Sequence, residues 1–425
     1  MRGNATQRIG RRTFVGMAGA GITASLAGCA GGSNGDGPGD DGLSIGLLAY
    51  EPGAAPMGTA QENAAELAVQ ELNDEGGVLG EDVQLDVANY QGSASTASDR
   101  YLEFVVEDDV DITAGVFQTE VMVDLMSEIA SHQTIHMSGG HTSPVISEMV
   151  ADNYDDYRYQ FRPYGNAVHW MHSIADMCGY MQDQEGWERI ALLNEEFEWT
   201  QTFTDDLPDE LEDLGLEVVF NDRYPADTED FSPLFDSIEA EDADATLMGM
   251  AHTAGPALLQ WQEQEREFVI GGQIAQIVNP AAYGDFDGTI EFAMSNAPAV
   301  HTAELTDETI PFAERYYDEF GIYPNDDFAY ATYDGIKMWA EVVEELGTAD
   351  TEDVIEGLLD ASYEGTRGVV EFQGENDEFP HDARFGEGYL ERINFQWQED
   401  DGEGIQNVVH PDHHATADYQ EPDWY

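Results

Sequence analysis

Residues 43–92 carry the pattern that most constrains the fold of this chain. An uninterrupted apolar run at 45–49 has the length of a buried strand, and a loop rich in Gly and Pro follows it. Thr59 stands three residues before Glu62, the spacing of a capping box, so a helix with one apolar face is expected to begin there. Alternating apolar residues at 83–87 then predict a second strand. The stretch predicts a βαβ unit whose long loop lies at the carboxyl end of a strand, where open α/β sheets bind ligands.

The alternation of strands and helices continues along the chain. Further strands are expected at 110–116, 134–138, 189–194, 216–221, 244–250 and 268–272, and helices at 94–107, 120–131, 166–182, 200–214, 231–240, 254–265, 306–320 and 326–346. Such alternation is typical of parallel, doubly wound sheets. The expected fold class is therefore α/β, and 425 residues are enough for two domains with additional ends.

The opening unit resembles a known family. The segments IGLLAYEPGAAPMG and AAELAVQELNDEGGVLG, and above all the run at 72–80 (LNDEGGVLG), are similar to the opening of the branched-chain amino-acid-binding (Leu/Ile/Val-binding) proteins. These are type 1 periplasmic solute-binding proteins of ABC transporters, and the similarity extends with decreasing clarity to about residue 400. The resemblance implies two doubly wound, Rossmann-like lobes joined by a three-crossing hinge, which close over a ligand bound between them.

The resemblance and the composition of the ends divide the chain into five parts. The expected boundaries are 1–28 for a signal, 29–42 for a flexible tether, 43–163 with 297–370 for lobe 1, 164–296 with 371–409 for lobe 2, and 410–425 for a C-terminal tail. The tether is rich in Gly, Ser and Asp, a composition typical of flexible linkers. The tail shows no periodicity.

The first residues have the features of an export signal. The run Arg11-Arg12-Thr13-Phe14-Val15 fits the twin-arginine pattern, and the apolar segment at 15–27 is too short to span a bilayer. The run Leu26-Ala27-Gly28-Cys29 resembles a lipoprotein processing box, with Cys29 as the acylated first residue of the mature protein. The alternative is a soluble exported protein in which Cys29 occurs by chance. The expected location is the extracellular face of the cell membrane, reached by the twin-arginine route and held by a lipid anchor.

Acidic residues dominate the chain. It has 87 Asp and Glu against 15 Lys and Arg, so its formal charge is −72, and cleavage before Cys29 would remove four Arg and leave −76. Self-repulsion of this size destabilises a compact state unless salt screens it, and at about 1 M salt the Debye length falls to about 3 Å. We therefore expect a halophilic, haloarchaeal-type protein that folds only in concentrated salt. Nucleic-acid binding is not expected, because no basic patch exists beyond the first 12 residues.

Two loops that follow expected lobe 1 strands, 115–119 and 138–144, have the composition of an anion-binding site. Their glycines allow close approach of the backbone, and each loop precedes a helix, whose N-terminus favours negative charge. The resemblance implies that these loops bind a carboxylate of the ligand, with a further contact from the opening loop. The residues concerned are Met57, Gln118, Thr119, Gly140, His141 and Thr142. The alternative for the Gly139-Gly140 pair is a tight turn without a ligand.

Three candidate residues follow expected strands of lobe 2: Trp199, His252 and Gln273. The resemblance implies an aromatic pocket residue at Trp199, and a packing aromatic is an equally good interpretation. Gln273 stands where amino-acid-binding members carry an acid for the ammonium group. Because a neutral amide cannot neutralise a buried ammonium, either another acid does so or the ligand has no amino group.

Other motifs favour no further chemistry. The tail residues His410, His413 and His414 could bind a metal, but histidines in an irregular tail are more often solvated, so neither a metal site nor a cofactor is expected. Cys178 lies in an apolar helical pattern and is expected in the core. The chain has no nucleophile elbow, Walker A loop, HExxH or paired CxxC motif, so no enzyme is predicted.

The function expected from these patterns is that of a monomeric, lipid-anchored solute-binding protein. It would bind a small polar organic ligand, such as a branched-chain or other amino acid, an amide or a carboxylate, and deliver it to the membrane subunits of an ABC permease. A sensor with the same fold is the first alternative, and an extracellular hydrolase that uses the same cleft is the second.

Overall fold

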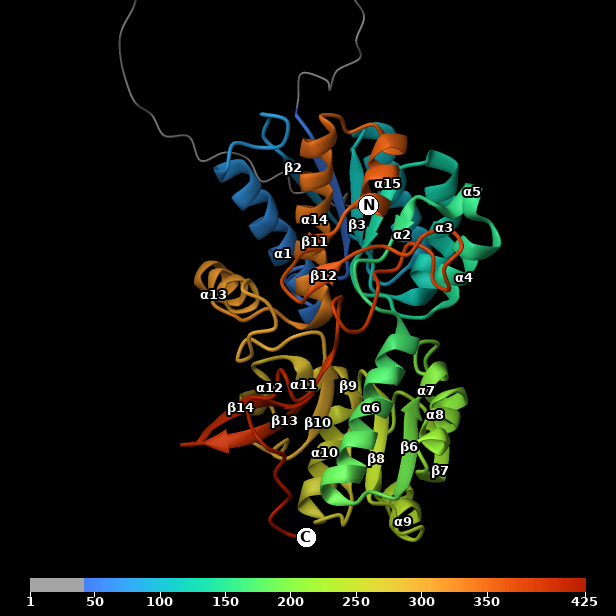
Figure 1. The fold of residues 1–425 in the computed structure, drawn as a ribbon, viewed down its shortest axis with the longest axis vertical. Helices are drawn as coiled ribbons and strands as arrows, with labels where there is room; N and C mark the ends of the chain where they lie inside the picture. Colours follow the sequence, from blue (N-terminus) through green and yellow to red (C-terminus); the bar gives the residue numbers. More distant parts are fainter. Residues whose placement is uncertain (1–41) are drawn as a thin grey trace, which may run out of the picture.

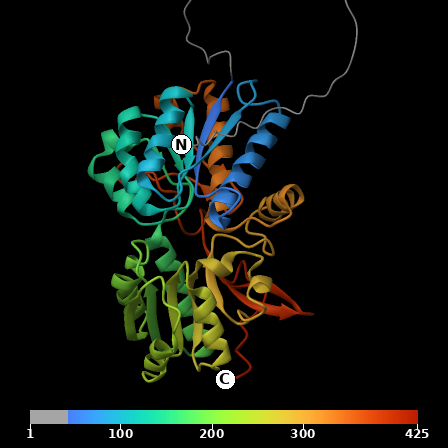
Figure 2. The same ribbon diagram turned by 180° about the vertical axis from the view of Figure 1, so that it is seen from behind.

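The computed structural model describes residues 42–425. The expected signal, Cys29 and all but the last residue of the tether lie outside the described residues. Two α/β lobes lie one above the other and are joined near the middle of the molecule, as both views show (Figure 1, Figure 2). The chain enters lobe 1 at its outer end and runs toward the junction between the lobes (Figure 1).

Lobe 1 is built on a five-stranded sheet with the strand order β2-β1-β3-β4-β5. All neighbouring strands are parallel. The strands are β1 (Ser44–Ala49), β2 (Gln84–Asn89), β3 (Ile112–Gly115), β4 (Ile135–Ser138) and β5 (Gln160–Phe161). This order confirms the expected doubly wound sheet, in which the direction of winding reverses between β1 and β3.

Helices pack on this sheet from the first part of the chain and again from its later part. The first group is α1 (Pro56–Asp74), α2 (Ala94–Leu102), the π-helix η1 (Glu103–Glu107), α3 (Thr119–His132), α4 (Val145–Asp152) and α5 (Tyr154–Tyr157). The later group is α13 (Thr309–Phe320), α14 (Asp326–Leu346) and α15 (Thr351–Asp360), followed by the small hairpin of β11 (Tyr363–Glu364) and β12 (Val369–Val370). Helix α14 lies against α1 and β4, as expected for a helix that returns to lobe 1.

Lobe 2 contains a parallel sheet in the order β7-β6-β8-β9 and an antiparallel sheet in the order β10-β13-β14. The strands are β6 (Arg189–Glu195), β7 (Glu217–Tyr224), β8 (Ala245–Met250), β9 (Val269–Ile274), β10 (Met294–Ala297), β13 (Ile393–Asp400) and β14 (Glu403–His410). The helices are α6 (Ala167–Glu185), α7 (Gln201–Asp205), α8 (Leu207–Asp213), α9 (Ser232–Glu239), α10 (Ala254–Glu263), α11 (Ala275–Val278) and α12 (Ala282–Asp285). Strand β10 lies beside β9.

Each lobe has its own apolar core. Ile45, Leu47 and Leu48 of β1 are fully buried, as a central strand covered on both faces requires. In lobe 2, Cys178 is fully buried among the apolar side chains of α6, β6 and β8, and burial raises the pKa of its thiol. The expectation that Cys178 is a core residue is therefore confirmed.

The last crossing between the lobes comes later than the expected boundary at residue 370. Phe372, Ala383 and Leu390 belong to the lobe 1 core, whereas Ile393 belongs to the lobe 2 core. The irregular segment between them stays with lobe 1 because the buried Asp382 pairs with Arg162 (Nη1 to Oδ2, 3.1 Å). A segment without periodicity gives no sequence signal of this contact.

The structure also corrects the start of the first helix and shows where the residues after β14 lie. Helix α1 begins at Pro56 and not at the capping box of Thr59, because Pro at the first helical position is pre-organised for a helix start. The residues after β14 form no helix or strand, yet they pack on lobe 2. The Trp424 ring lies 5.1 Å from the Trp261 ring, and Gln396 exchanges two hydrogen bonds with the backbone of Gln420, both of 2.8 Å.

Within residues 42–425, no helix combines the length and the apolar character that crossing a bilayer requires.

Candidate functional site

The loops at the carboxyl ends of the strands of both lobes form the candidate site. In lobe 1 these loops follow β1, β3 and β4, and in lobe 2 they follow β6, β8 and β9. The winding of the lobe 2 sheet reverses between β6 and β8, as it does between β1 and β3 in lobe 1. Ligands of open α/β sheets bind outside such reversal points.

The lobe 1 loops place two hydroxyl groups at helix starts. Thr119 is the first residue of α3, whose N-terminal N–H groups receive no side-chain cap, and Thr142 precedes α4. Both side chains are about 95% buried, and neither hydroxyl hydrogen-bonds to another described residue. Gly140 lies between these loops with a φ of +151°, and a Cβ there would come within 2.6 Å of the Phe328 ring. Glycine is therefore required at this position.

The backbone of this loop is only partly available to a ligand. The Gly140 N–H donates to the Tyr164 hydroxyl (2.6 Å), and that hydroxyl donates to the His141 carbonyl (2.9 Å). The Gly140 N–H is therefore not available to an anion. The groups of the expected anion-binding site that can still donate a hydrogen bond are the hydroxyl groups of Thr119 and Thr142 and the N–H groups at the N-terminus of α3.

His141 does not present its ring to a ligand. Its imidazole is fully buried, with Nε2 2.6 Å from the Ser138 hydroxyl and Nδ1 3.2 Å from the Arg162 guanidinium. Burial, with the charge of Arg162, holds the pKa of His141 well below its usual range, so the ring is neutral. The His141 side chain therefore packs inside lobe 1, so the predicted ligand contact of this residue would have to come from its backbone.

The remaining lobe 1 candidates lie at the ends of the same loops. Met57 is half-buried in the first turn of α1. Gln118 precedes α3, and its Oε1 is buried without a hydrogen-bond partner among the described residues. A buried polar atom without a partner is rare in native structures, so Gln118 remains a good candidate for a ligand contact.

In lobe 2, Trp199 belongs to an aromatic cluster, one member of which, Trp170, contacts Arg392. Its ring packs edge-on against Trp170 at 6.3 Å and against Phe203 at 5.7 Å. The guanidinium of Arg392 lies over the Trp170 ring, 4.0 Å from its centre. Trp199 is half-buried, so the structure places it in a packed cluster that still has an accessible surface.

The loop after β8 is held by a carboxylate that the sequence did not single out. Glu195 accepts hydrogen bonds from the Ala251 N–H (2.7 Å), the His252 N–H (3.0 Å) and the Thr253 hydroxyl (2.7 Å). Burial alone would raise the pKa of Glu195, but these bonds and His252 lower it, so Glu195 is ionised. The same contact raises the pKa of His252, whose side chain is 52% exposed. Because its oxygens are fully engaged, Glu195 is not free to bind an ammonium group.

Gln273 at the end of β9 faces Arg392. Its Oε1 accepts a hydrogen bond of 3.3 Å from Nη2 of Arg392, and its Nε2 has no partner among the described residues. Nε1 of Trp170 is likewise buried and unpaired in the described part of the chain. Two side chains that each have an unpaired donor therefore contact the same guanidinium group, a setting that suits an oxygen-rich ligand.

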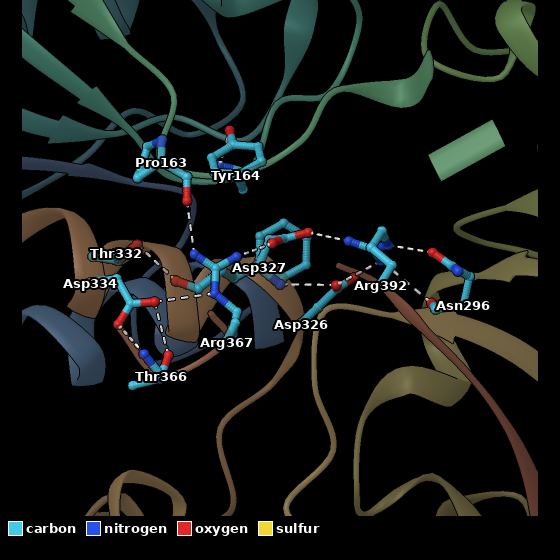
Figure 3. Close-up of polar contacts among 12 residues, drawn as sticks. Pro163, Tyr164, Asn296, Asp326, Asp327, Thr332, Asp334, Thr366, Arg367 and Arg392 are labelled. Atoms are coloured by element: carbon cyan, nitrogen blue, oxygen red, sulfur yellow. Dashed lines mark hydrogen bonds and ion pairs between the residues drawn. The ribbon is translucent and has the colours of Figure 1, made fainter. Parts of the chain in front are cut away.

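Arg392 connects lobe 2 to the start of α14. Figure 3 shows its guanidinium between Asn296 and the paired carboxylates of Asp326 and Asp327. Nη1 donates to Asp327 Oδ2 at 2.5 Å, and Nη2 lies 3.6 Å from Asp326 Oδ1. Oδ2 of Asp326 has no hydrogen-bond partner among the described residues, and burial raises the pKa of this carboxyl.

A second arginine continues this network into lobe 1 (Figure 3). Arg367 donates to Asp327 Oδ1 (2.7 Å), to Asp334 Oδ2 (3.2 Å) and to the Pro163 carbonyl (2.8 Å). Three carboxylates thus face two guanidinium groups, all at most 3% exposed. We call Asp326, Asp327, Asp334, Arg367 and Arg392 the hinge network, because it lies where the chain crosses between the lobes.

The hinge network brings the candidate loops of the two lobes together. Gly140 contacts Phe328, which follows Asp327 in α14, and Asp327 pairs with Arg392, which binds Gln273. The loop after β4 and the end of β9 are therefore linked by a short series of direct contacts. Arg392, Asp326 and Trp170 were not among the site residues expected from the sequence. The available signal was that Arg392 is one of few cations in a chain of this acidity.

Known proteins share this architecture. A family model described as periplasmic binding protein matches residues 42–389. The chain belongs to the periplasmic binding protein family. The match covers both lobes up to the last crossing, and it confirms the resemblance drawn from residues 43–92. Within this family the chain has the fold of the type 1 periplasmic binding proteins.

This periplasmic binding protein is similar to several Leu/Ile/Val-binding proteins. It is 25% identical to Leu/Ile/Val-binding protein BraC3 of Rhizobium johnstonii over 223 residues, which are 51% of this chain and 56% of that protein. It is 22% identical to Leu/Ile/Val-binding protein homolog 7 of Brucella abortus over 393 residues, which are 88% of this chain and 93% of that protein.

Two solved structures of the same fold hold different ligands. LivJ of Streptococcus pneumoniae, in complex with isoleucine, has a TM-score of 0.70 at 17% identity, over 87% of this chain and 100% of that chain. A solute-binding protein from Rhodopseudomonas palustris BisB5, in complex with 3,4-dihydroxybenzoic acid, has a TM-score of 0.72 at 17% identity, over 87% of this chain and 97% of that chain. These similarities confirm the type 1 fold with two lobes.

Proposed function

We propose that this protein is the extracellular, lipid-anchored receptor of an ABC importer. It binds a small polar organic ligand between the facing loops of the two lobes and delivers the ligand to the permease after the lobes close. The observation that carries the proposal is the direct series of contacts from Gly140 through Phe328, Asp327 and Arg392 to Gln273. Because these contacts connect a loop of lobe 1 to a strand end of lobe 2, a ligand bound to one lobe is affected by the position of the other lobe.

The chemistry of the loops favours a ligand with a carboxylate or a similar oxygen. Thr119 and Thr142 supply free hydroxyl groups in lobe 1, while Gln273 and Trp170 supply unpaired donors in lobe 2. An amino group would have to use Asp326, whose Oδ2 lacks a partner among the described residues. We therefore favour amino acids only modestly over amides and amino-free acids, including aromatic acids. The relatives bound to isoleucine and to 3,4-dihydroxybenzoic acid represent these two classes.

Calorimetry in concentrated salt tests the site and the ligand class. Leucine, its deaminated keto acid, an aromatic acid and a short amide are compared as ligands. For whichever compound binds, Thr142→Val should lower the affinity by about 10- to 150-fold, because a hydrogen bond to a charged group contributes about 1.5–3 kcal/mol. The matched control is Thr348→Val, beyond the far end of the 21-residue helix α14 and roughly 30 Å from the hinge network. If both variants bind the compound as tightly as the wild type does, the Thr142 hydroxyl does not contact the ligand and the proposed anion-binding site is wrong.

Gln273→Glu separates the two ligand classes. The added carboxylate should strengthen binding of an amino acid and weaken binding of an amino-free acid, since the hinge network already has more carboxylates than guanidinium groups. Stronger binding of an amino-free acid by the Glu variant would contradict the lobe 2 assignment.

Anchoring is tested separately, at Cys29. Cys29→Ser should release the protein into the medium and leave ligand affinity unchanged, because the residue precedes the two lobes in the sequence. Continued membrane retention of the Ser variant would mean that another segment anchors the protein.

A further inference from the structure

The residues after β14 bring two histidines to the segment that crosses between the lobes. Nε2 of His413 lies 2.9 Å from Oε2 of Glu391, and Nε2 of His414 lies 3.7 Å from the same oxygen. One ligand-type atom from each of the three residues lies within 4.8 Å of the other two. Glu391 immediately precedes Arg392 of the hinge network. This cluster is distinct from the candidate ligand loops and has no part in the function proposed above.

The turn that carries the histidines is fixed by lobe 2 and not by the histidines themselves. Thr416 donates its N–H to the Val408 carbonyl (2.8 Å), and its hydroxyl accepts from the Val408 N–H (2.9 Å). The His414 N–H donates to the Pro411 carbonyl (3.0 Å). These bonds fix the backbone that carries the two imidazoles, and each imidazole faces Glu391, as a pre-organised binding site requires.

The cluster is partly enclosed and has one open side. The side chains of His414 and Glu391 are 14% and 28% exposed, and that of His413 is 58% exposed. The His414 ring also lies within hydrogen-bonding reach of the Glu304 backbone. A hydrogen bond from one ring nitrogen to a carbonyl is the usual way in which the other is kept free and oriented for a metal.

The donor set decides which cations fit. Two imidazole nitrogens and one carboxylate oxygen form a common three-residue set for Zn²⁺, with a fourth position left for water. Imidazole suits Zn²⁺, Co²⁺, Ni²⁺ and Cu²⁺, whereas Mg²⁺ and Ca²⁺ prefer oxygen ligands alone. The many exposed carboxylates of this chain therefore compete for the hard cations but not for this site.

We propose that Glu391, His413 and His414 form a binding site for a divalent transition metal such as Zn²⁺. The bound ion joins the C-terminal segment to the crossing segment and so stiffens the backbone next to Arg392. The sequence showed His413 and His414 as residues that could bind a metal, but it did not show the third ligand, because Glu391 is remote from the histidines along the chain.

The test is a titration of purified, untagged protein with Co²⁺ and Zn²⁺ in concentrated potassium chloride with excess Mg²⁺. Because excess Mg²⁺ occupies the surface carboxylates, the Co²⁺ and Zn²⁺ that still bind do so at sites that contain nitrogen ligands. We expect one equivalent of Co²⁺ with the visible absorption of a nitrogen-ligated ion, and a Zn²⁺-dependent rise in melting temperature, since a metal that binds the native state stabilises it. His414→Ala and Glu391→Gln should each lower the Zn²⁺ affinity by at least about tenfold.

Two further variants keep the test decisive. His413→Ala removes an exposed side chain and should fold normally, so its loss of affinity cannot be attributed to misfolding. His172→Ala is the matched control, because His172 is also exposed and pairs with a carboxylate, that of Glu210 at 3.6 Å. Wild-type affinity in His413→Ala and His414→Ala, or no Zn²⁺ binding above the Mg²⁺ background, would show that the cluster is an ion pair only. Ligand affinity measured without metal should be unchanged in all variants, which separates this proposal from the proposed function.

Discussion

Asp327 is expected to stabilise the junction of the lobes more than any exposed ion pair of this protein. Its carboxylate accepts from Arg367 Nη1 at 2.7 Å and from Arg392 Nη1 at 2.5 Å, and it is 3% exposed. In Asp327→Asn, Arg367 keeps Asp334 and the Pro163 carbonyl, but Arg392 keeps only Asn296, Gln273 and the more distant Asp326. Removal of one partner from a buried ion pair costs about 3–5 kcal/mol. We expect the free energy of unfolding to fall by that amount.

The assay is urea unfolding followed by circular dichroism in concentrated potassium chloride, because guanidinium chloride would itself change the ionic strength. The matched control is Asp377→Asn, which breaks the exposed pair with Arg384 (2.9 Å, side chains 41% and 39% exposed). Exposed pairs contribute about 0–1 kcal/mol, and salt screens them further. The loss in Asp327→Asn should also be the same at lower and higher multimolar salt, since ions do not reach the buried network. A loss within about 1 kcal/mol of the control would refute the reasoning.

Three further predictions concern the whole fold. Dialysis to low salt at neutral pH should abolish the far-ultraviolet circular dichroism of the native state because of the formal charge of −72, or −76 if the chain is cleaved before Cys29, whereas a retained cooperative melt would contradict the halophilic interpretation. Burial outweighs Arg162 and raises the pKa of Asp382 from 3.8 to about 6, so its stabilising contribution is complete below pH 4 and is lost as the pH rises through 6. The stability difference between wild type and Asp382→Asn should therefore change by about 3 kcal/mol across this window, and a constant difference would disprove the shift. Gly140→Ala should destabilise by about 1–3 kcal/mol and weaken ligand binding, because its Cβ meets Phe328, while Gly284→Ala, which meets nothing within 4 Å, should not.

The sequence by itself determined the regular part of the molecule. The apolar run at 45–49 and the later strands lie close to where periodicity predicted them, and α14 occupies its expected range of 326–346. Each of these helices and strands is specified by residues that are close together in the sequence, through its hydrophobic period and the residues at its ends. The order of strands and helices along the chain follows from these local patterns. The family resemblance in residues 43–92 then supplied the arrangement of two lobes, which the structure confirms.

The tertiary structure alone decided how charged and polar residues from distant segments meet. No local pattern marks the partners of Arg392, and only the fold shows that it faces Asp326, Asp327 and Gln273. The sequence also does not show that the His141 side chain is enclosed between Ser138 and Arg162. Hydrophobic periodicity records which face of an element is buried, whereas the partners of a buried charge are chosen by the packing of whole lobes, which no local pattern records.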